Sequence, residues 1–264
     1  MTTKLLNLFK GTLAAIALTG AATLPAAAAE LAEIQAAESI NIGVLIDFPP
    51  YGILNADNEP DGYDATVAKM LADDLGVEIN LIPVTGPNRI PYLLSGQVDI
   101  LVSSLAITPA RAEQVDFSDP YAAIRIGLMA EADLDIASAE DLDGVSVAVA
   151  RASGQDTTIT AIAPEGTVIR RFDDDVSAVQ ALLSGQVQSI GASNTVMAQI
   201  RQVAPGKFDE KFTLNEFRLA IAVTPDAPEL LAYVNMFLAG ATEAGALNEA
   251  HIQWLDEPLP DFAE

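Results

Sequence analysis

The sequence contains no cysteine, one histidine (His251) and only 13 lysine and arginine residues in a chain of 264. The absence of cysteine excludes disulfide bonds, thiol nucleophiles and thiolate zinc sites, so the fold must be stabilised by its core. A single histidine excludes a histidine-based metal site, and we expect His251 to have a packing or surface role beside Trp254. No glycine-rich phosphate loop is present. We therefore expect neither a cofactor nor a metal.

Basic residues are outnumbered by 37 acidic ones, which gives a formal net charge of −24 at pH 7. Such a negative field repels nucleic acid and anionic lipid, so neither is an expected partner. The three aspartates at 173–175 could hold a hard cation, although a run of this kind more often begins a helix. The few arginines are then the residues to consider for binding an anionic group.

The first 29 residues, 1–29, have the pattern of a cleaved export signal. Lys4 and Lys10 form the basic start, an uncharged stretch rich in alanine and leucine follows, and four alanines offer a cleavage site before Glu30. The apolar stretch is shorter than the ~20 residues that span a bilayer, so a retained anchor is the less favoured alternative. We expect a soluble, periplasmic mature chain whose net charge changes from −24 to −26 with loss of the two lysines.

One six-residue phrase, Leu-Leu-Ser-Gly-Gln-Val, occurs at 93–98 and again at 182–187. A helix end, a glycine suited to a left-handed C-cap and a β-branched residue entering a strand describe one helix-to-strand joint. Two such joints are too few and too distant for a solenoid, whose periods are about 20–50 residues. Unless six common residues recur by chance, the phrase indicates two similar α/β lobes with a ligand-binding cleft between them.

The expected elements follow the same order twice. The first set has strands at 40–46, 77–81 and 98–103 with helices at 64–75 and 89–95. The second set has strands at 145–150, 168–169 and 187–192 with helices at 155–163 and 174–184. Further strands are expected at 123–130 and 218–223, and two helices rich in alanine and leucine finish the chain. The alternation predicts an α/β fold with mostly parallel, helix-flanked sheets.

The segment from Asp99 to Tyr121 has the densest set of potential binding groups. A strand there ends in hydroxyls and free backbone N–H groups, and Arg111 lies a few residues beyond. A carboxylate ligand requires such a set, because each hydrogen bond to a charged group contributes ~1.5–3 kcal/mol. The alternative is that Arg111 pairs with Asp116 or Asp119 on the surface. These residues alone leave the two interpretations about even.

Short motifs occur in order along nearly the whole chain after residue 30: Pro49-Pro50-Tyr51, Gly62-Tyr63-Asp64, Leu75-Gly76-Val77, Ser95 to Asp99, Thr108 to Arg111, Asp116 to Tyr121, Leu142-Asp143-Gly144 and Gly245 to Trp254. Together they resemble the family 3 extracellular solute-binding proteins, the polar amino acid receptors of bacterial ABC importers. The resemblance implies a two-lobed periplasmic binding protein fold of type II, in which two crossovers form a hinge. Lobe 1 would comprise 30–125 with 225–264, and lobe 2 would comprise 126–224. A ligand would be captured by hinge closure and delivered to an inner-membrane permease by a monomeric receptor.

The resemblance also implies a ligand site with Arg111 as the residue that binds the ligand carboxylate. Further contacts would come from two groups near Arg111, two flanking aromatic rings and two donors near a helix N-terminus in the second lobe. These are Ser104 and the N–H of Ala106, then Phe48 and Tyr51, then Ser153 and Gly154.

Two positions depart from the family pattern. Many amino acid receptors of the family have an acidic residue after the second-lobe strand, where it holds the ligand ammonium. This sequence has Ser193, followed by Asn194, and Leu45 stands where some members have a polar or charged group. Either another carboxylate, such as Asp47 or Asp175, holds the ammonium, or the ligand is not an ordinary α-amino acid.

The segment 83–91 is similar to the glutamate/aspartate-binding branch, in which the corresponding arginine helps to hold the side-chain carboxylate. Arg89 would then be a second anion contact, and acidic amino acids would be slightly favoured as ligands. The alternative is an arginine turned to solvent or bonded to neighbouring carbonyls. Arg151, directly after a second-lobe strand, is a further and weaker candidate.

We expect a receptor rather than an enzyme. The main alternative is an exported enzyme on the same scaffold, of the cyclohexadienyl or arogenate dehydratase type, because a fold does not fix a function. Such an enzyme needs a general acid in the cleft, and no motif identifies one. A ligand-sensing module is a third interpretation, less favoured because no sensor domain or transmembrane segment is found with it in the sequence.

Overall fold

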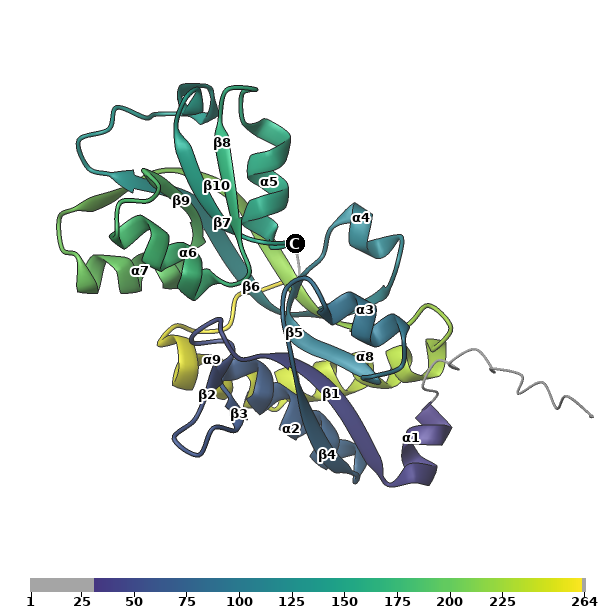
Figure 1. The fold of residues 1–264 in the computed structure, drawn as a ribbon. Coiled ribbons are helices and arrows are strands. Elements are labelled where there is room, and N and C mark those ends of the chain that lie inside the picture. The colour runs from purple at the N-terminus through teal and green to yellow at the C-terminus, as the bar shows by residue number, and fades with distance from the viewer. Residues whose placement is uncertain (1–30, 263–264) are drawn as a thin grey trace, which may run out of the picture.

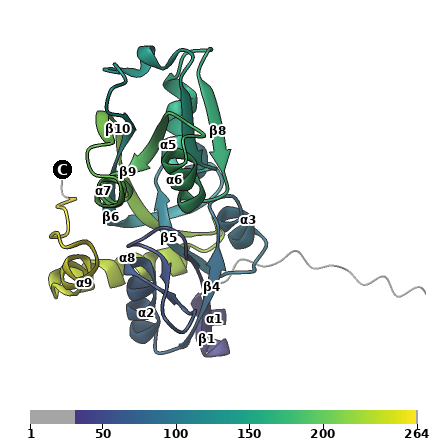
Figure 2. The ribbon, with the colours of Figure 1, turned by 60° about the vertical axis from the view of Figure 1, so that its left-hand side comes forward.

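Two α/β lobes, one above the other in Figure 1, form the part of the chain that the computed structural model describes, residues 31–262. Figure 2 shows the same two lobes from another side. The expected export signal at 1–29 lies outside the described residues. One eight-stranded sheet continues through both lobes in the order β4-β1-β5-β10-β6-β9-β7-β8. The predicted two-lobed α/β architecture is confirmed.

The lower lobe in Figure 1, lobe 1, contains the first βαβαβ unit of the chain. In it, β1 (Ser39–Leu45) pairs in parallel with β4 (Glu78–Val84) and with β5 (Ile100–Ala106). The connecting elements are α1 (Leu31–Ala37), β2 (Ile53–Leu54), β3 (Pro60–Asp61), α2 (Tyr63–Leu75), α3 (Arg89–Leu94) and α4 (Pro109–Ala112). The last two helices, α8 (Pro228–Glu243) and α9 (Ala246–Leu255), return to this lobe, where α9 packs against α2.

The upper lobe, lobe 2, repeats the parallel arrangement. Its central strand β7 (Ser146–Ala150) pairs in parallel with β8 (Val168–Phe172) and with β9 (Ser189–Ser193). The helices around it are η1 (Ala139–Leu142), α5 (Gly154–Ile162), α6 (Asp175–Leu183) and α7 (Asn194–Val203). In both lobes the parallel strands end toward the cleft, where ligands of open α/β sheets bind.

Two long strands connect the lobes. β6 (Asp116–Glu131) and β10 (Phe208–Val223) are antiparallel along their length, and each is longer than the strands expected at 123–130 and 218–223. The extra residues mix polar and aromatic side chains and include a proline, so pairing with a distant partner, rather than a local strand pattern, makes them extended. The predicted lobe boundaries are not tested by this pairing. Because the end of β10 pairs with β5, the second crossing is better proposed inside β10 than after it.

The repeated phrase forms the same joint in each lobe. Gly96 and Gly185 follow the ends of α3 and α6 with left-handed φ values of 70° and 74°. Each glycine N–H donates to a leucine carbonyl three residues earlier, over 3.0 Å in both copies. Val98 and Val187 then enter the core, each 1% exposed. A C-cap glycine followed by a buried valine is a local signal, which is why this part of the fold was predictable.

The C-terminal helices belong to the core of lobe 1. His251 is buried, its Nδ1 lies 2.7 Å from the Glu257 carbonyl, and its ring meets the edge of Tyr63, so it has a packing role. Among residues 31–262, no single helix is long and apolar enough to cross a membrane. α8 and α9 reach that length and composition only as a pair, which is bent by 77°.

Candidate functional site

A cavity of about 60 Å³ lies between the lobes. This is several times the ~10–15 Å³ that one water molecule requires. Of the ten predicted site residues, seven line it: Phe48, Arg89, Ser104, Ala106, Arg111, Ser153 and Gly154. The other three, Tyr51, Ser193 and Asn194, are not part of its lining. Their expected contacts with a ligand remain predictions.

Arg111 is fixed at the cavity by α4. Thr108 is the N-cap of this short helix, and Pro109 occupies its first turn, where a missing N–H costs nothing. The guanidinium donates from Nη1 to the Ala106 carbonyl over 2.8 Å and from Nη2 to the Ala152 carbonyl over 2.7 Å. Burial lowers the pKa of Arg111 to about 10, so the side chain stays charged at neutral pH.

The surface-pairing alternative for Arg111 does not hold. Only 8% of the residue is exposed, and the ion pairs found among residues 31–262 do not include it. Its known partners are backbone carbonyls, which orient the guanidinium without neutralising it. A buried, charged and oriented guanidinium is suited to bind a carboxylate.

Arg89 combines the two interpretations that the sequence left open. It lines the cavity, and it also donates from Nη1 to the Ser103 carbonyl over 2.7 Å and to the Ser104 carbonyl over 3.5 Å. Burial and, to a smaller extent, the charge of Arg111 lower its pKa to about 9. The bonded carbonyls use one nitrogen of the guanidinium, so Arg89 can also contribute positive charge to the cavity.

A buried carboxylate beneath the cavity escaped the sequence analysis. Asp64, fully buried in the first turn of α2, accepts hydrogen bonds from Tyr121 Oη over 2.6 Å and from Ser104 Oγ over 2.7 Å. Tyr121 Oη also accepts from the Ser104 N–H over 3.1 Å. This network holds Ser104 with a left-handed φ of 47°, a strained value for a residue other than glycine. Burial raises the pKa of Asp64 to about 7, although the two hydroxyl donors oppose the increase.

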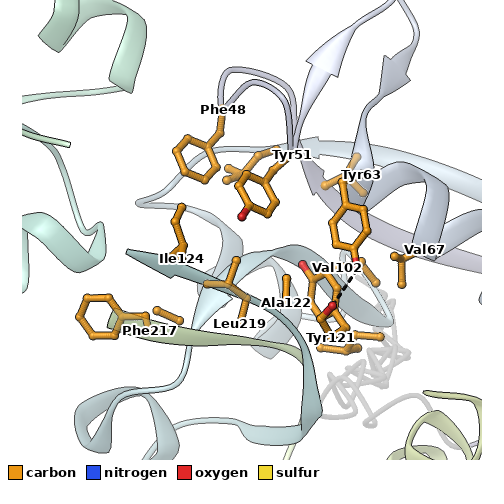
Figure 3. Packing of buried hydrophobic residues seen from close by; sticks show 14 of the residues in the cluster. Phe48, Tyr51, Tyr63, Val67, Val102, Tyr121, Ala122, Ile124, Phe217 and Leu219 are labelled. Carbon is orange, nitrogen blue, oxygen red and sulfur yellow. Dashed lines mark hydrogen bonds between the residues drawn. The ribbon is translucent and has the colours of Figure 1, made fainter. Parts of the chain in front are cut away.

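The aromatic wall has two layers. Phe48 lines the cavity and stacks on Tyr51 with ring centroids 5.3 Å apart (Figure 3). Tyr51 is 1% exposed and donates to the Ala123 carbonyl over 3.3 Å, so it supports Phe48 from behind. Ile124 and Phe217, from the two connecting strands, also line the cavity and are drawn below Phe48 in Figure 3. Phe217 was not predicted, because it belongs to the part of β10 that the sequence did not reveal.

The N-terminus of α5 is the lobe 2 wall opposite Arg111. Ser153 caps this helix by accepting a hydrogen bond from the Asp156 N–H over 3.2 Å. The N–H groups of Gly154 and Gln155 precede the first intrahelical bonds and are available to an anion. Phe217 packs so closely that a Cβ added to Gly154 would lie 2.7 Å from its ring. The cavity side of α5 therefore requires a glycine at this position.

Four aspartates bring negative charge to the same cavity. Asp47 follows β1 in lobe 1, and Asp173, Asp174 and Asp175 occupy the joint between β8 and α6 in lobe 2. Desolvation and then the charge of Asp47 raise the pKa of Asp175 to about 7. Desolvation and then the charge of Asp174 raise the pKa of Asp47. Within residues 31–262, no group of three or more acidic, histidine or cysteine residues is arranged to hold a metal ion.

The remaining candidates lie away from the centre of the site. Ser193 is fully buried and caps α7 by accepting from the Val196 N–H over 3.1 Å. Asn194 is the first residue of α7, and its buried Oδ1 has no hydrogen-bond partner among the described residues. Arg151 lines the cavity but is exposed, and it pairs with Asp173 over 3.5 Å. Lobe 2 therefore offers no carboxylate from the end of β9.

Comparison with known proteins agrees with this geometry. Residues 40–257 match the family model of the bacterial extracellular solute-binding proteins, family 3. The glutamine-binding protein of Geobacillus stearothermophilus is 31% identical over 199 residues, which are 73% of this chain and 76% of that protein. The solute receptor for L-cysteine of Neisseria gonorrhoeae is 28% identical, with a TM-score of 0.80 over 86% of this chain and 94% of the receptor.

A further solved structure is the ancestral amino acid-binding protein AncCDT-1, described as a precursor of cyclohexadienyl dehydratase. It is 28% identical, with a TM-score of 0.76 over 85% of this chain and 98% of that protein. The residues matched by the family model, 40–257, include strands of both lobes and the residues that line the cavity. The chain therefore belongs to the bacterial extracellular solute-binding proteins of family 3.

Proposed function

We propose that this protein is the periplasmic receptor of an ABC importer. It captures a polar amino acid or a related small carboxylate by closure of its two lobes and delivers it to a membrane permease. The observation that carries the proposal is Arg111, a buried guanidinium in the interlobe cavity that forms no ion pair among the described residues. The names of the similar receptors, for glutamine and L-cysteine, support an amino acid ligand.

The carboxylate would lie between Arg111 and the start of α5. Arg111 donates to the carbonyl of Ala152, two residues before Gly154, so the guanidinium and the free N–H groups of α5 are neighbours across the cleft. A guanidinium from one lobe and backbone donors from the other would hold the same carboxylate only when the lobes are closed. Ligand binding would therefore stabilise the closed arrangement.

Arg89 supports an acidic amino acid as one option within this class. It brings a second guanidinium to the lobe 1 wall, where it could bind a side-chain carboxylate. Its bonds to the carbonyls of Ser103 and Ser104 also give it a purely structural role. The choice between acidic and other polar amino acids therefore depends on a binding measurement.

A melting-shift screen against the common L-amino acids and small dicarboxylates tests the proposal. A compound present at 100 times its dissociation constant adds ~2.7 kcal/mol to the free energy of unfolding. Titration calorimetry would then give the affinity of each compound that raises the melting temperature. A screen in which no carboxylate raises it would show that the protein is not a receptor of this class.

An exported dehydratase is the second candidate. It is favoured by the similarity to AncCDT-1 and by Asp175, which lines the cavity with its pKa raised to about 7 and could act as a general acid. Incubation with prephenate or arogenate separates the two functions, because a dehydratase releases the aromatic product. Turnover that disappears in the Asp175→Asn variant would establish the enzyme, whereas binding without product supports the receptor.

A further inference from the structure

Two of the cavity carboxylates are not neutralised within the structure. Asp175 accepts one hydrogen bond, from Gln155 Nε2 to its Oδ1 over 3.0 Å, and is partly exposed to the cavity. Asp47 lies across the cleft from it in lobe 1. Neither takes part in an ion pair among the described residues. Asp173 and Asp174 differ, because the first pairs with Arg151 and the second caps α6 through the Ser177 N–H.

Asp47 and Asp175 come from different lobes, so closure brings their charges together. The effect is visible in their electrostatics, since the charge of Asp47 contributes to the raised pKa of Asp175. Like charges that approach in a partly desolvated cleft repel each other unless a cation lies between them. Arg89 attracts both carboxylates but is bonded to carbonyls in the lobe 1 wall. No ion pair joins Arg89 to either carboxylate, so a cation placed between Asp47 and Asp175 would add an attraction that the residues around them do not supply at contact distance.

Ser104 points to the same chemistry independently of the aspartates. Its hydroxyl donates its proton to Asp64 over 2.7 Å, so toward the cavity it offers lone pairs rather than a donor. An acceptor of this kind suits an ammonium group and does not suit a carboxylate. The serine that sequence analysis assigned to the ligand carboxylate thus fits better beside a cation.

The position in lobe 2 where the resemblance leads us to expect an acidic residue does not supply this carboxylate. Ser193 stands where an acidic residue was expected from the resemblance, but its hydroxyl caps α7 and lies 2.8 Å from Thr195 Oγ1. Two joints of lobe 2 reach the cavity, after β7 and after β8, and the second carries Asp175.

We propose that Asp175 and Asp47, one from each lobe, hold the protonated amine of the ligand, with Ser104 Oγ as a further acceptor. The inference rests on the proposed function and narrows its ligand class to compounds with both a carboxylate and an amine. Arg111 and α5 take the carboxylate, and Asp47 and Asp175 take the amine. Amine-free carboxylates leave the two aspartates facing each other in the closed cleft and are rejected.

Paired probes test this inference by titration calorimetry on the full mature chain. L-glutamate, L-glutamine and L-arginine differ in side-chain charge, and each is compared with its amine-free counterpart: glutarate, glutaramate and 5-guanidinopentanoate. For the amino acid that binds best, we expect the counterpart to bind about 100-fold more weakly or worse. We expect Asp175→Asn to weaken binding of the amino acid by about 30-fold and to reduce the difference within that pair.

Two further variants complete the design. Asp47→Asn should weaken the same amino acid while leaving its counterpart unchanged or improved, because it also removes interlobe repulsion. Asp226→Asn, at an exposed loop position outside the cavity, is the matched control and should leave every affinity unchanged. Melting temperatures of the unliganded variants verify folding.

The possible results separate this inference from the proposed function. If the wild type binds an amino acid and its amine-free counterpart equally, the receptor function stands and the assignment of the amine to Asp47 and Asp175 is overturned. Unchanged affinity in both Asp175→Asn and Asp47→Asn overturns it as well. If no probe binds to the wild type and the screen of carboxylates also fails, the proposed function falls and this inference falls with it.

Discussion

The Nη2 atom of Arg111, in lobe 1, donates to the carbonyl oxygen of Ala152, in lobe 2, over 2.7 Å. Ala152 has a left-handed φ of 58°, which turns its carbonyl toward the arginine just before α5 begins. The guanidinium proposed to bind the ligand carboxylate is therefore also a direct link between the lobes. If Arg111 binds the carboxylate as proposed, binding and closure depend on one side chain.

Arg111→Ala should abolish the response to every ligand that stabilises the wild type. The substitution removes the proposed carboxylate contact and the bond to Ala152 together, so the ~2.7 kcal/mol expected at 100 times the dissociation constant is lost. A melting-shift assay with the best amino acid measures it. Arg201→Ala, at a partly exposed ion pair with Glu210, is the control that should retain the full shift. Retention of the shift in Arg111→Ala would show that the carboxylate binds elsewhere.

Gly86→Ala should oppose closure without disturbing either lobe. A Cβ on Gly86 would lie 2.7 Å from the carbonyl oxygen of Arg151, which belongs to the other lobe. Overpacking of this kind costs about 1–3 kcal/mol, so we expect affinity to fall roughly 5- to 100-fold while the unliganded melting temperature changes little. Calorimetry gives the affinity, and small-angle scattering with saturating ligand shows whether the lobes still close.

Gly240→Ala is the control for this steric argument. Gly240 lies within α8, and a Cβ there would meet no atom within 4 Å. Alanine is favoured over glycine in a helix by about 1 kcal/mol, so this variant should be at least as stable as the wild type and bind normally. Equal affinities for Gly86→Ala and Gly240→Ala would contradict the close approach of Gly86 and Arg151.

The parts of the fold that sequence predicted are those with local signals. The joints at Gly96 and Gly185 were predictable because a C-cap glycine acts on its own helix. The full length of β6 was not, because Asp116 to Tyr121 contains Pro120 and three polar side chains and becomes extended through pairing with β10. Strand pairing between segments about a hundred residues apart leaves little trace in either segment alone.

The site shows the same division. The local sequence around Arg111, a strand end followed by a proline turn, left surface pairing and ligand binding about even, and the family resemblance pointed to the cavity that Arg111 lines. Asp64 was not predictable, because its hydroxyl partners Ser104 and Tyr121 are 40 and 57 residues away. Ser193 was placed beside the cleft by its position after a strand, but α7 begins at the next residue and uses its hydroxyl as a cap. Because its hydroxyl caps α7, Ser193 is held away from the cavity.

Tyr121→Phe should destabilise the protein and weaken binding. The phenol donates to Asp64 and accepts from the Ser104 N–H, so its removal leaves two buried groups short of a partner. A lost buried hydrogen bond of this kind costs ~1–3 kcal/mol, measured as the free energy of unfolding in urea. Tyr233→Phe is the matched control, because that hydroxyl bonds Asp74 near the surface, and its loss should cost ~1 kcal/mol or less. Equal effects of the two substitutions would argue against a special role of the Asp64 network.

The unliganded protein should become more stable as the pH falls from 8 to 5. Burial raises the pKa of both Asp64 and Asp175 to about 7, whereas each titrates near 3.8 in the unfolded chain. Between those two pKa values the folded protein binds more protons than the unfolded chain, so the free energy of unfolding decreases as the pH rises. The stabilising contribution of each carboxyl group is complete below about pH 3.8 and is lost as the pH rises through about 7. Glu210 has a lowered pKa, so its ionisation changes the free energy of unfolding only at lower pH. Urea unfolding at pH 5, 6, 7 and 8 measures the slope, and Asp64→Asn should reduce it by up to about 1.4 kcal/mol per pH unit. Stability that instead increases between pH 5 and 8 would show that both carboxyl groups are ionised in the folded protein throughout this range.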